Sequence, residues 1–238
     1  MINDASLLHY FQRGLIPGPT ETEEEFLKRA LQARSLTHSE WQEVSTPFAI
    51  AIDWVPLTYS NQQIAWWEGA ATWISDEGLP SIQLRTRFQK GSFWGYRREE
   101  VLAHEAVHAA RARFEEPQFE EILAYFTAPQ AWKRFLGPLF SRSWEPLVLL
   151  LSVLIGAYVP LIPSAVIILA LSWLIYRQRA FKRCCRKLSF PLLLCLTDRE
   201  IRSFARMPEA AIPAYLDKNS TPRGRLLRLL FRRNGNRI

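Results

Sequence analysis

The sequence predicts an α+β fold, in which a small domain of helices and short antiparallel strands is joined to a transmembrane helical hairpin and a helical C-terminal region. Three observations predict it: helical spacing of apolar residues near the N-terminus, short alternating runs between residues 48 and 88, and an uncharged apolar run over Leu147–Tyr176. We therefore divide the chain of 238 residues into a domain at 1–143, a membrane segment at 144–177 and a basic juxtamembrane region at 178–238.

The N-terminal domain is expected to begin with a helix over Thr22–Leu36. Acidic residues occupy the first turn of this segment, basic residues follow, and apolar residues such as Phe26 and Ala30 recur at helical spacing. Strands are expected next because the following runs are short and alternating or rich in β-branched residues. These runs are Phe48–Val55, Ala70–Ile74 and Ser81–Phe88.

The pattern HExxH occurs at His104–His108. No Gly or Pro interrupts Glu99–Phe114, so the pattern is expected on a helix, where residues four positions apart lie on one face about 6 Å from each other. His104 and His108 can then bind one zinc ion, while Glu105 between them reaches a water on that ion. The spacing therefore predicts a Zn²⁺ site with two histidine ligands.

A third protein ligand is expected from the segment that follows the HExxH helix. The residues Glu115–Pro117 end that helix, and a second helix begins close behind them. If the second helix folds back against the first, Glu121 reaches the level of His108 better than Glu120 does. Glu121 is therefore the preferred third ligand, and Glu120 is the alternative.

The segment Val101–Ala110 resembles the extended signature of zincin metalloproteases, and Glu121–Tyr125 resembles the second-helix glutamate motif of the gluzincins. The resemblance implies a minimal, zincin-like gluzincin in which the glutamate helix packs back against the HExxH helix, with Ser81–Phe88 as the edge strand that pairs with substrate. Two features depart from the family. Only twelve residues separate His108 from Glu121, and Tyr125 stands where the family has an acidic residue that supports the site.

The resemblance implies hydrolysis of peptide bonds in a polypeptide substrate. Zinc would polarise the scissile carbonyl and activate a water, while Glu105 would act as the general base and pass the proton to the leaving amine. Tyr96, Arg97 and Tyr125 are unranked candidates for stabilising the oxyanion. An endopeptidase is favoured over an exopeptidase. The alternative function is a non-catalytic membrane scaffold with a structural zinc site.

The run Leu147–Tyr176 contains thirty residues without a charged side chain or histidine, more than the ~18 that indicate a membrane helix. Pro160 and Pro163 near its middle favour a turn between two short helices, and a single kinked span is the alternative. Basic residues flank both ends of the run. The positive-inside rule therefore predicts an integral membrane protein in a lipid bilayer, with its N-terminal domain and C-terminus both cytoplasmic.

The net charge of +7 is unevenly distributed. Residues 1–143 carry 14 Lys and Arg against 18 Asp and Glu, whereas residues 144–238 carry 16 against 5. This division indicates membrane attachment by the C-terminal half, and no nucleic-acid partner is expected. The basic amphipathic tail at Pro222–Arg233 is expected on an anionic membrane face, and binding to RNA or to a partner protein is the less favoured alternative for it.

The three cysteines lack CxxC spacing and all lie in the basic half, which argues against a disulfide-stapled secreted domain. No cleaved secretory signal is expected from the N-terminal sequence. No oligomeric state follows from the sequence.

Overall fold

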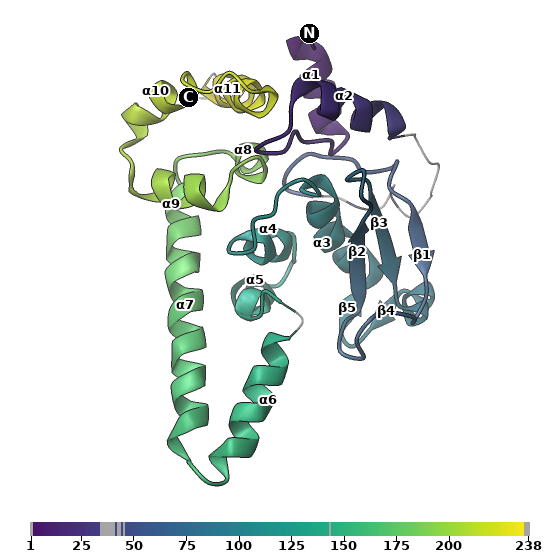
Figure 1. Ribbon diagram of the computed structural model, residues 1–238, viewed down its shortest axis with the longest axis vertical. Helices are drawn as coiled ribbons and strands as arrows, with labels where there is room; N and C mark the ends of the chain where they lie inside the picture. The colour runs from purple at the N-terminus through teal and green to yellow at the C-terminus, as the bar shows by residue number, and fades with distance from the viewer. Residues whose placement is uncertain (1, 34–40, 42–43, 45, 143, 236–238) are drawn as a thin grey trace.

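The computed structural model describes the chain except residues 1, 34–40, 42–43, 45, 143 and 236–238. The described residues form many helices and a few short strands, which confirms the α+β class. Figure 1 shows a body that contains the sheet and most of the helices, and a pair of helices that projects away from it. The projecting pair contains the apolar segment.

Helix α1 covers Asp4–Gln12 and α2 covers Glu23–Gln32. A capping box begins α2: the Thr22 hydroxyl accepts from the Glu25 amide, and the Glu25 carboxylate accepts from the Thr22 amide. The helix expected over Thr22–Leu36 is therefore present up to Gln32. The last three residues of that range lie outside the described residues.

A three-stranded sheet has the order β1-β3-β2. Its strands are β1 (Leu57–Tyr59), β2 (Ala70–Ile74) and β3 (Pro80–Leu84). β2 pairs antiparallel with β3, as expected, but β1 pairs parallel with it, so the prediction of antiparallel strands is wrong for β1. β3 is central and β2 is an edge strand. The strand expected at Ala70–Ile74 is confirmed. The prediction of an edge strand over Ser81–Phe88 is wrong, because β3 is paired on both sides and a 3₁₀ helix, η2 (Thr86–Lys90), follows it.

The segment Phe48–Val55 is not a strand, although one was expected there. Its alternate apolar side chains are buried, which explains the strand-like pattern. Its backbone is not paired with any described strand. The Ala51 amide donates to the carbonyl of Gln12 on α1 at 2.7 Å, and Ala49 has a left-handed φ of 56°. The alternation therefore reflects an irregular buried segment, which precedes β1.

A small hairpin joins β4 (Ser92–Phe93) to β5 (Tyr96–Arg97). Its two turn residues, Trp94 and Gly95, have φ values of 49° and 75°, as a type I′ turn requires. Helix α3 starts directly after β5, so the hairpin lies beside the start of the HExxH helix.

The helices that carry the predicted site are α3 (Arg98–Ala110) and α4 (Glu120–Tyr125). They pack against each other, and α3 also contacts β2 and β3. The expected HExxH helix and glutamate helix are therefore both present. They are followed by α5 (Ala131–Leu136) and the 3₁₀ helix η3 (Gly137–Leu139).

The projecting pair consists of α6 (Glu145–Gly156) and α7 (Leu161–Cys185), which pack side by side (Figure 1). The chain reverses before Leu161, where the prolines predicted a turn. Gly156 permits the close approach of the two helices, because a Cβ at this position would lie 2.5 Å from Pro163 Cγ.

The prediction of a transmembrane hairpin at 144–177 is wrong, because one of the two helices is too short to cross a membrane. Among the described residues, α7 is the one helix long and apolar enough to cross a membrane. Helix α6 has 12 residues, or about 18 Å at ~1.5 Å per residue, which is shorter than a hydrocarbon core of about 30 Å. Helix α7 also continues past residue 177 to Cys185. In this last part of the helix, Arg177 and Phe181 are buried against the body.

The C-terminal helices are α8 (Phe190–Leu194), α9 (Asp198–Arg206), η4 (Glu209–Ala211), α10 (Ile212–Leu216) and α11 (Pro222–Gly235). One hydrophobic core joins them to the N-terminal helices and to α3 and α4. The expected membrane-facing tail instead buries Leu226, Leu227 and Leu230 in this core, and α11 packs on α1. The chain on both sides of α6 and α7 therefore folds as one body.

Candidate metal centre

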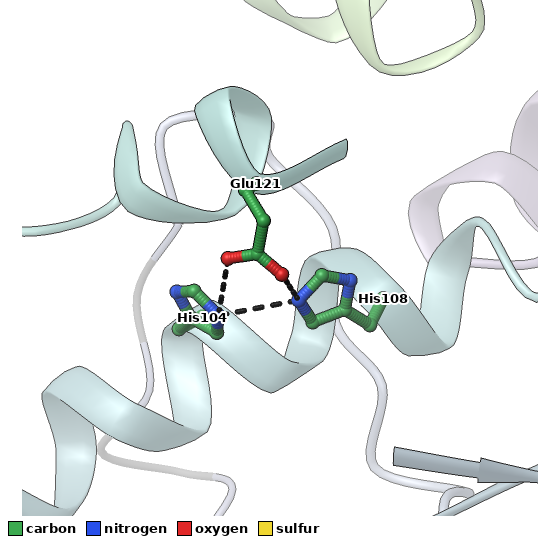
Figure 2. A group of neighbouring side chains, drawn as sticks. All are labelled: His104, His108 and Glu121. Atoms are coloured by element: carbon green, nitrogen blue, oxygen red, sulfur yellow. Dashed lines mark hydrogen bonds and ion pairs between the residues drawn. The ribbon is translucent and has the colours of Figure 1, made fainter. Parts of the chain in front are cut away.

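His104, His108 and Glu121 converge between α3 and α4 (Figure 2). Their candidate ligand atoms all lie within 4.8 Å of one another. The two imidazole Nε2 atoms are 3.2 Å apart, and the two Glu121 oxygens lie 3.5 Å from His104 Nε2 and 3.4 Å from His108 Nε2. The structure therefore brings together the three residues that the sequence predicted as ligands.

Local structure explains this convergence. The four-residue spacing places both histidines on one face of α3, and α4 packs on that face. On α4, Ile122, Leu123 and Ala124 are buried in the core, so the preceding Glu121 side chain is directed toward α3, as Figure 2 shows.

Glu120, the alternative ligand, is not part of this group. One of its oxygens lies 3.2 Å from His108 Nδ1, on the side of the ring opposite Nε2, and the other accepts from Arg111 Nε at 2.6 Å. The sequence did not identify a group that orients the histidines. Arg111, the C-cap residue of α3 three positions after His108, was the available signal.

Glu105 lies on α3 between the two histidines and is 6% exposed. The Thr72 hydroxyl on β2 donates to Glu105 Oε2 at 2.7 Å. Sequence reasoning missed Thr72, because its contact with Glu105 spans 33 positions of the chain and depends on how β2 packs against α3.

A cleft of about 870 Å³ contains His104, Glu105, His108 and Glu121. The edge strand β2, the β4–β5 hairpin and the chain around the start of α6 form much of its lining. Lining residues on these walls include Thr72, Ile74, Phe93, Trp94, Phe140, Arg142 and Pro146. The cleft therefore extends from the sheet edge to the base of the projecting helices.

Two of the three oxyanion candidates, Tyr96 and Tyr125, line this cleft, whereas Arg97 is exposed outside it. The Tyr125 ring packs edge-on against His104 with the centroids 4.6 Å apart. Burial raises the pKa of Tyr125 well above its ordinary value. Its phenol therefore keeps its proton at neutral pH and is a hydrogen-bond donor.

The pKa values of the two histidines are shifted in opposite directions. Burial lowers the pKa of His104. Burial also opposes the charged form of His108, but hydrogen bonds to Glu120 and Glu121 outweigh it and raise the pKa of His108 well above its usual range. The pKa of Glu121 is lowered, because contact with the histidines outweighs its own burial. Of the two imidazoles, His108 therefore holds a positive charge more readily.

Comparisons of the chain with protein-family models, with curated proteins and with solved structures find no match.

Proposed function

We propose that the protein is a membrane-associated, zinc-dependent peptidase with His104, His108 and Glu121 as metal ligands and Glu105 as the general base. The observation that carries the proposal is the convergence of these four side chains in one cleft. The resemblance of the α3 and α4 sequences to gluzincins also supports a zinc-dependent peptidase.

The donor set and its spacing fit zinc. Two imidazole nitrogens and one carboxylate oxygen are usual ligands of catalytic zinc, and three protein ligands leave a fourth position open. Ligand atoms at tetrahedral zinc, with bonds of about 2.0–2.2 Å, lie about 3.3–3.6 Å apart. The two imidazole nitrogens are 3.2 Å apart, and each lies 3.4–3.5 Å from a different oxygen of Glu121. With one ligand atom from each residue, all three lie within 4.8 Å of one another.

When bound, zinc supplies Lewis-acid polarisation of the scissile carbonyl and lowers the pKa of a water. Glu105 then accepts a proton and passes it to the leaving amine. The Thr72 hydroxyl donates to one oxygen of Glu105, a residue that lines the cleft, and so limits the positions of its carboxylate. Tyr125 and Tyr96 provide phenol donors in the same cleft.

The cleft favours an extended polypeptide. Strand β2 pairs with β3 along one edge, and within the described sheet its other edge has no strand beside it. Residues of β2 also line the cleft. A peptide that adds to such an edge runs through the cleft, so an endopeptidase is favoured over an exopeptidase.

Membrane association is proposed from the projecting helices. Large apolar side chains are exposed along both, including Leu150, Leu151, Leu154, Ile168 and Leu169. Because the chain before α6 and after α7 shares one core, we infer that the body of the protein lies on one face of the bilayer, which the basic flanks assign to the cytoplasm. The cleft reaches Pro146 at the start of α6, which favours membrane-proximal substrates.

Metal analysis tests the site. The purified protein should contain about one zinc per chain, as expected for three protein ligands. A variant with both His104→Ala and His108→Ala should contain none. Absence of zinc from the parent protein would refute the site.

A peptide-library digestion tests the chemistry. Glu105→Gln should retain zinc and lose cleavage, because glutamine cannot accept the proton. Equal cleavage by parent and variant would refute Glu105 as the base. Zinc binding without cleavage by the parent would favour the scaffold with a structural zinc site.

A further inference from the structure

The contacts of Glu120 connect the candidate metal centre to the chain beyond α7. Glu120 contacts His108 Nδ1 with one oxygen, at 3.2 Å, and accepts from Arg111 Nε with the other, at 2.6 Å. Both Glu120 oxygens therefore have a partner. The contact with His108 lies at Nδ1, on the side of the ring opposite the Nε2 atom that faces His104 and Glu121.

Arg111 is anchored in turn by the C-terminal region. Its side chain is fully buried, and one terminal nitrogen donates to the carbonyls of Leu194 and Leu196 at 2.7 and 3.0 Å. Its guanidinium also lies over the Phe114 ring, 4.3 Å from the centroid. These contacts limit the positions that the guanidinium, and with it Glu120, can adopt.

A second contact from the C-terminal region holds the backbone at the start of α4. The Asp198 carboxylate accepts from the amides of Gln118 and Phe119, at 2.8 and 3.1 Å. Phe119, the N-cap residue of α4, provides no side-chain cap of its own. Asp198 therefore fixes from α9 the backbone of the two residues that precede α4, including the N-cap amide that the N3 side chain of a capping box would otherwise bond.

We propose that Glu120 is a positioning residue that holds His108 in its zinc-binding orientation, and that Arg111 and Asp198 make the chain beyond α7 a structural part of the metal site. This inference rests on the proposed zinc site. A hydrogen bond at Nδ1 fixes the ring orientation and leaves Nε2 free to face the metal. The Glu120–His108 contact has this geometry.

The expected change in zinc affinity follows from similar contacts in other metal sites. Loss of a group that orients a metal-ligating histidine weakens metal binding about 10- to 100-fold. Glu120→Gln retains the size of the side chain. However, an amide places an NH₂ donor where one of the two carboxylate oxygens lies, so either Arg111 Nε or His108 Nδ1 loses the acceptor it has in the parent protein.

Zinc affinity, measured by competition with a chromogenic chelator, tests the proposal. We expect Glu120→Gln to raise the Kd for zinc about 10- to 100-fold. Glu115→Gln is the matched control, since Glu115 is exposed in the preceding turn and should keep the parent Kd. The absorption spectrum of the cobalt-loaded protein gives a second readout and should change for Glu120→Gln only.

The contribution of the C-terminal region is tested by Asp198→Asn, with Asp217→Asn as a control at an exposed site in the same region. We expect a weaker zinc affinity for Asp198→Asn and the parent affinity for the control. Thermal unfolding of each metal-free variant separates positioning from folding. A variant with a lower Tm but the parent Kd and cobalt spectrum has a purely structural defect.

A parent Kd and cobalt spectrum in Glu120→Gln would overturn the positioning role of Glu120 and leave the zinc site intact. Parent values in Asp198→Asn would overturn the contribution of the C-terminal region. Failure of the parent protein to bind zinc would instead refute the proposed function, and the inference with it.

Discussion

The hydrogen bond from Thr72 to Glu105 gives a quantitative test of the proposed general base. Thr72→Val removes the hydroxyl while keeping a side chain of similar shape. Glu105 is 6% exposed, so bulk water has little access to replace the lost donor. The variant should therefore bind zinc normally and hydrolyse peptides more slowly.

The expected magnitude follows from the contact. At 2.7 Å, the bond joins a hydroxyl to a carboxylate, and hydrogen bonds to charged groups contribute about 1.5–3 kcal/mol. At ~1.36 kcal/mol per factor of ten, kcat/KM should fall about 10- to 150-fold if the whole contribution orients Glu105 in the transition state.

The assay compares kcat/KM and zinc content of parent, Thr72→Val and Glu105→Gln on one peptide identified from the library digestion. Thr58→Val is the control, because Thr58 lies on β1 in the same sheet and donates to the Ile82 carbonyl, away from the site. Unchanged kcat/KM for Thr72→Val, beside an inactive Glu105→Gln, would refute the reasoning that Thr72 holds the base.

Three further predictions concern stability, reactivity and membrane binding. Glu200→Gln leaves buried Arg223 without its charged partner and should lower the free energy of unfolding at pH 7 by about 3–5 kcal/mol, measured by urea denaturation. Contact with Arg223 outweighs burial and lowers the pKa of Glu200, so this stabilisation should be present above pH ~4.3 and decline as the pH falls further. Burial raises the pKa of Cys195 to about 12, so at pH 8 iodoacetamide should label Cys195 in the urea-unfolded chain but not in the native protein. Ile168→Lys places a charge on an exposed apolar position of α7 and should weaken liposome binding, at a cost of about 2.5–3.5 kcal/mol if the site reaches the bilayer centre.

Each of these predictions has a distinct contrary result. A parent-like acid profile for Glu200→Gln would show that the Glu200 pair does not contribute to acid unfolding. Rapid labelling of native Cys195 at pH 8 would contradict its burial. Leu31→Lys, at an exposed position on α2, is the control for flotation with liposomes, and equal binding by both lysine variants would refute insertion of α7.

Much of the candidate metal site could be predicted from the sequence because its main spacing is local. His104 and His108 are one helical turn apart on α3, so the helix alone places them together. Glu121 could be predicted from a short connection that folds α4 back on α3. Glu120, Arg111 and Thr72 could not be assigned, because their roles depend on how α4, β2 and the C-terminal region pack around α3.

The incorrect predictions about the fold have related causes. Alternating burial at Phe48–Val55 resembled a strand, but its backbone bonds to the end of α1 instead of to a neighbouring strand. The order of strands put β2 at the edge where Ser81–Phe88 had been expected. The apolar run predicted a turn near its prolines, but the helix lengths on either side allow only α7 to span a membrane.

The sequence by itself determined the helix that carries HExxH, the preferred third ligand and the apolar segment, because each depends on residues close together in the chain. Only the tertiary structure decided which strand borders the cleft, which carboxylate contacts His108 Nδ1, and that the chain beyond α7 supports α3 and α4. The physical reason is that these features depend on contacts between segments up to 85 residues apart. Such contacts form only when one core buries the apolar faces of both halves of the chain.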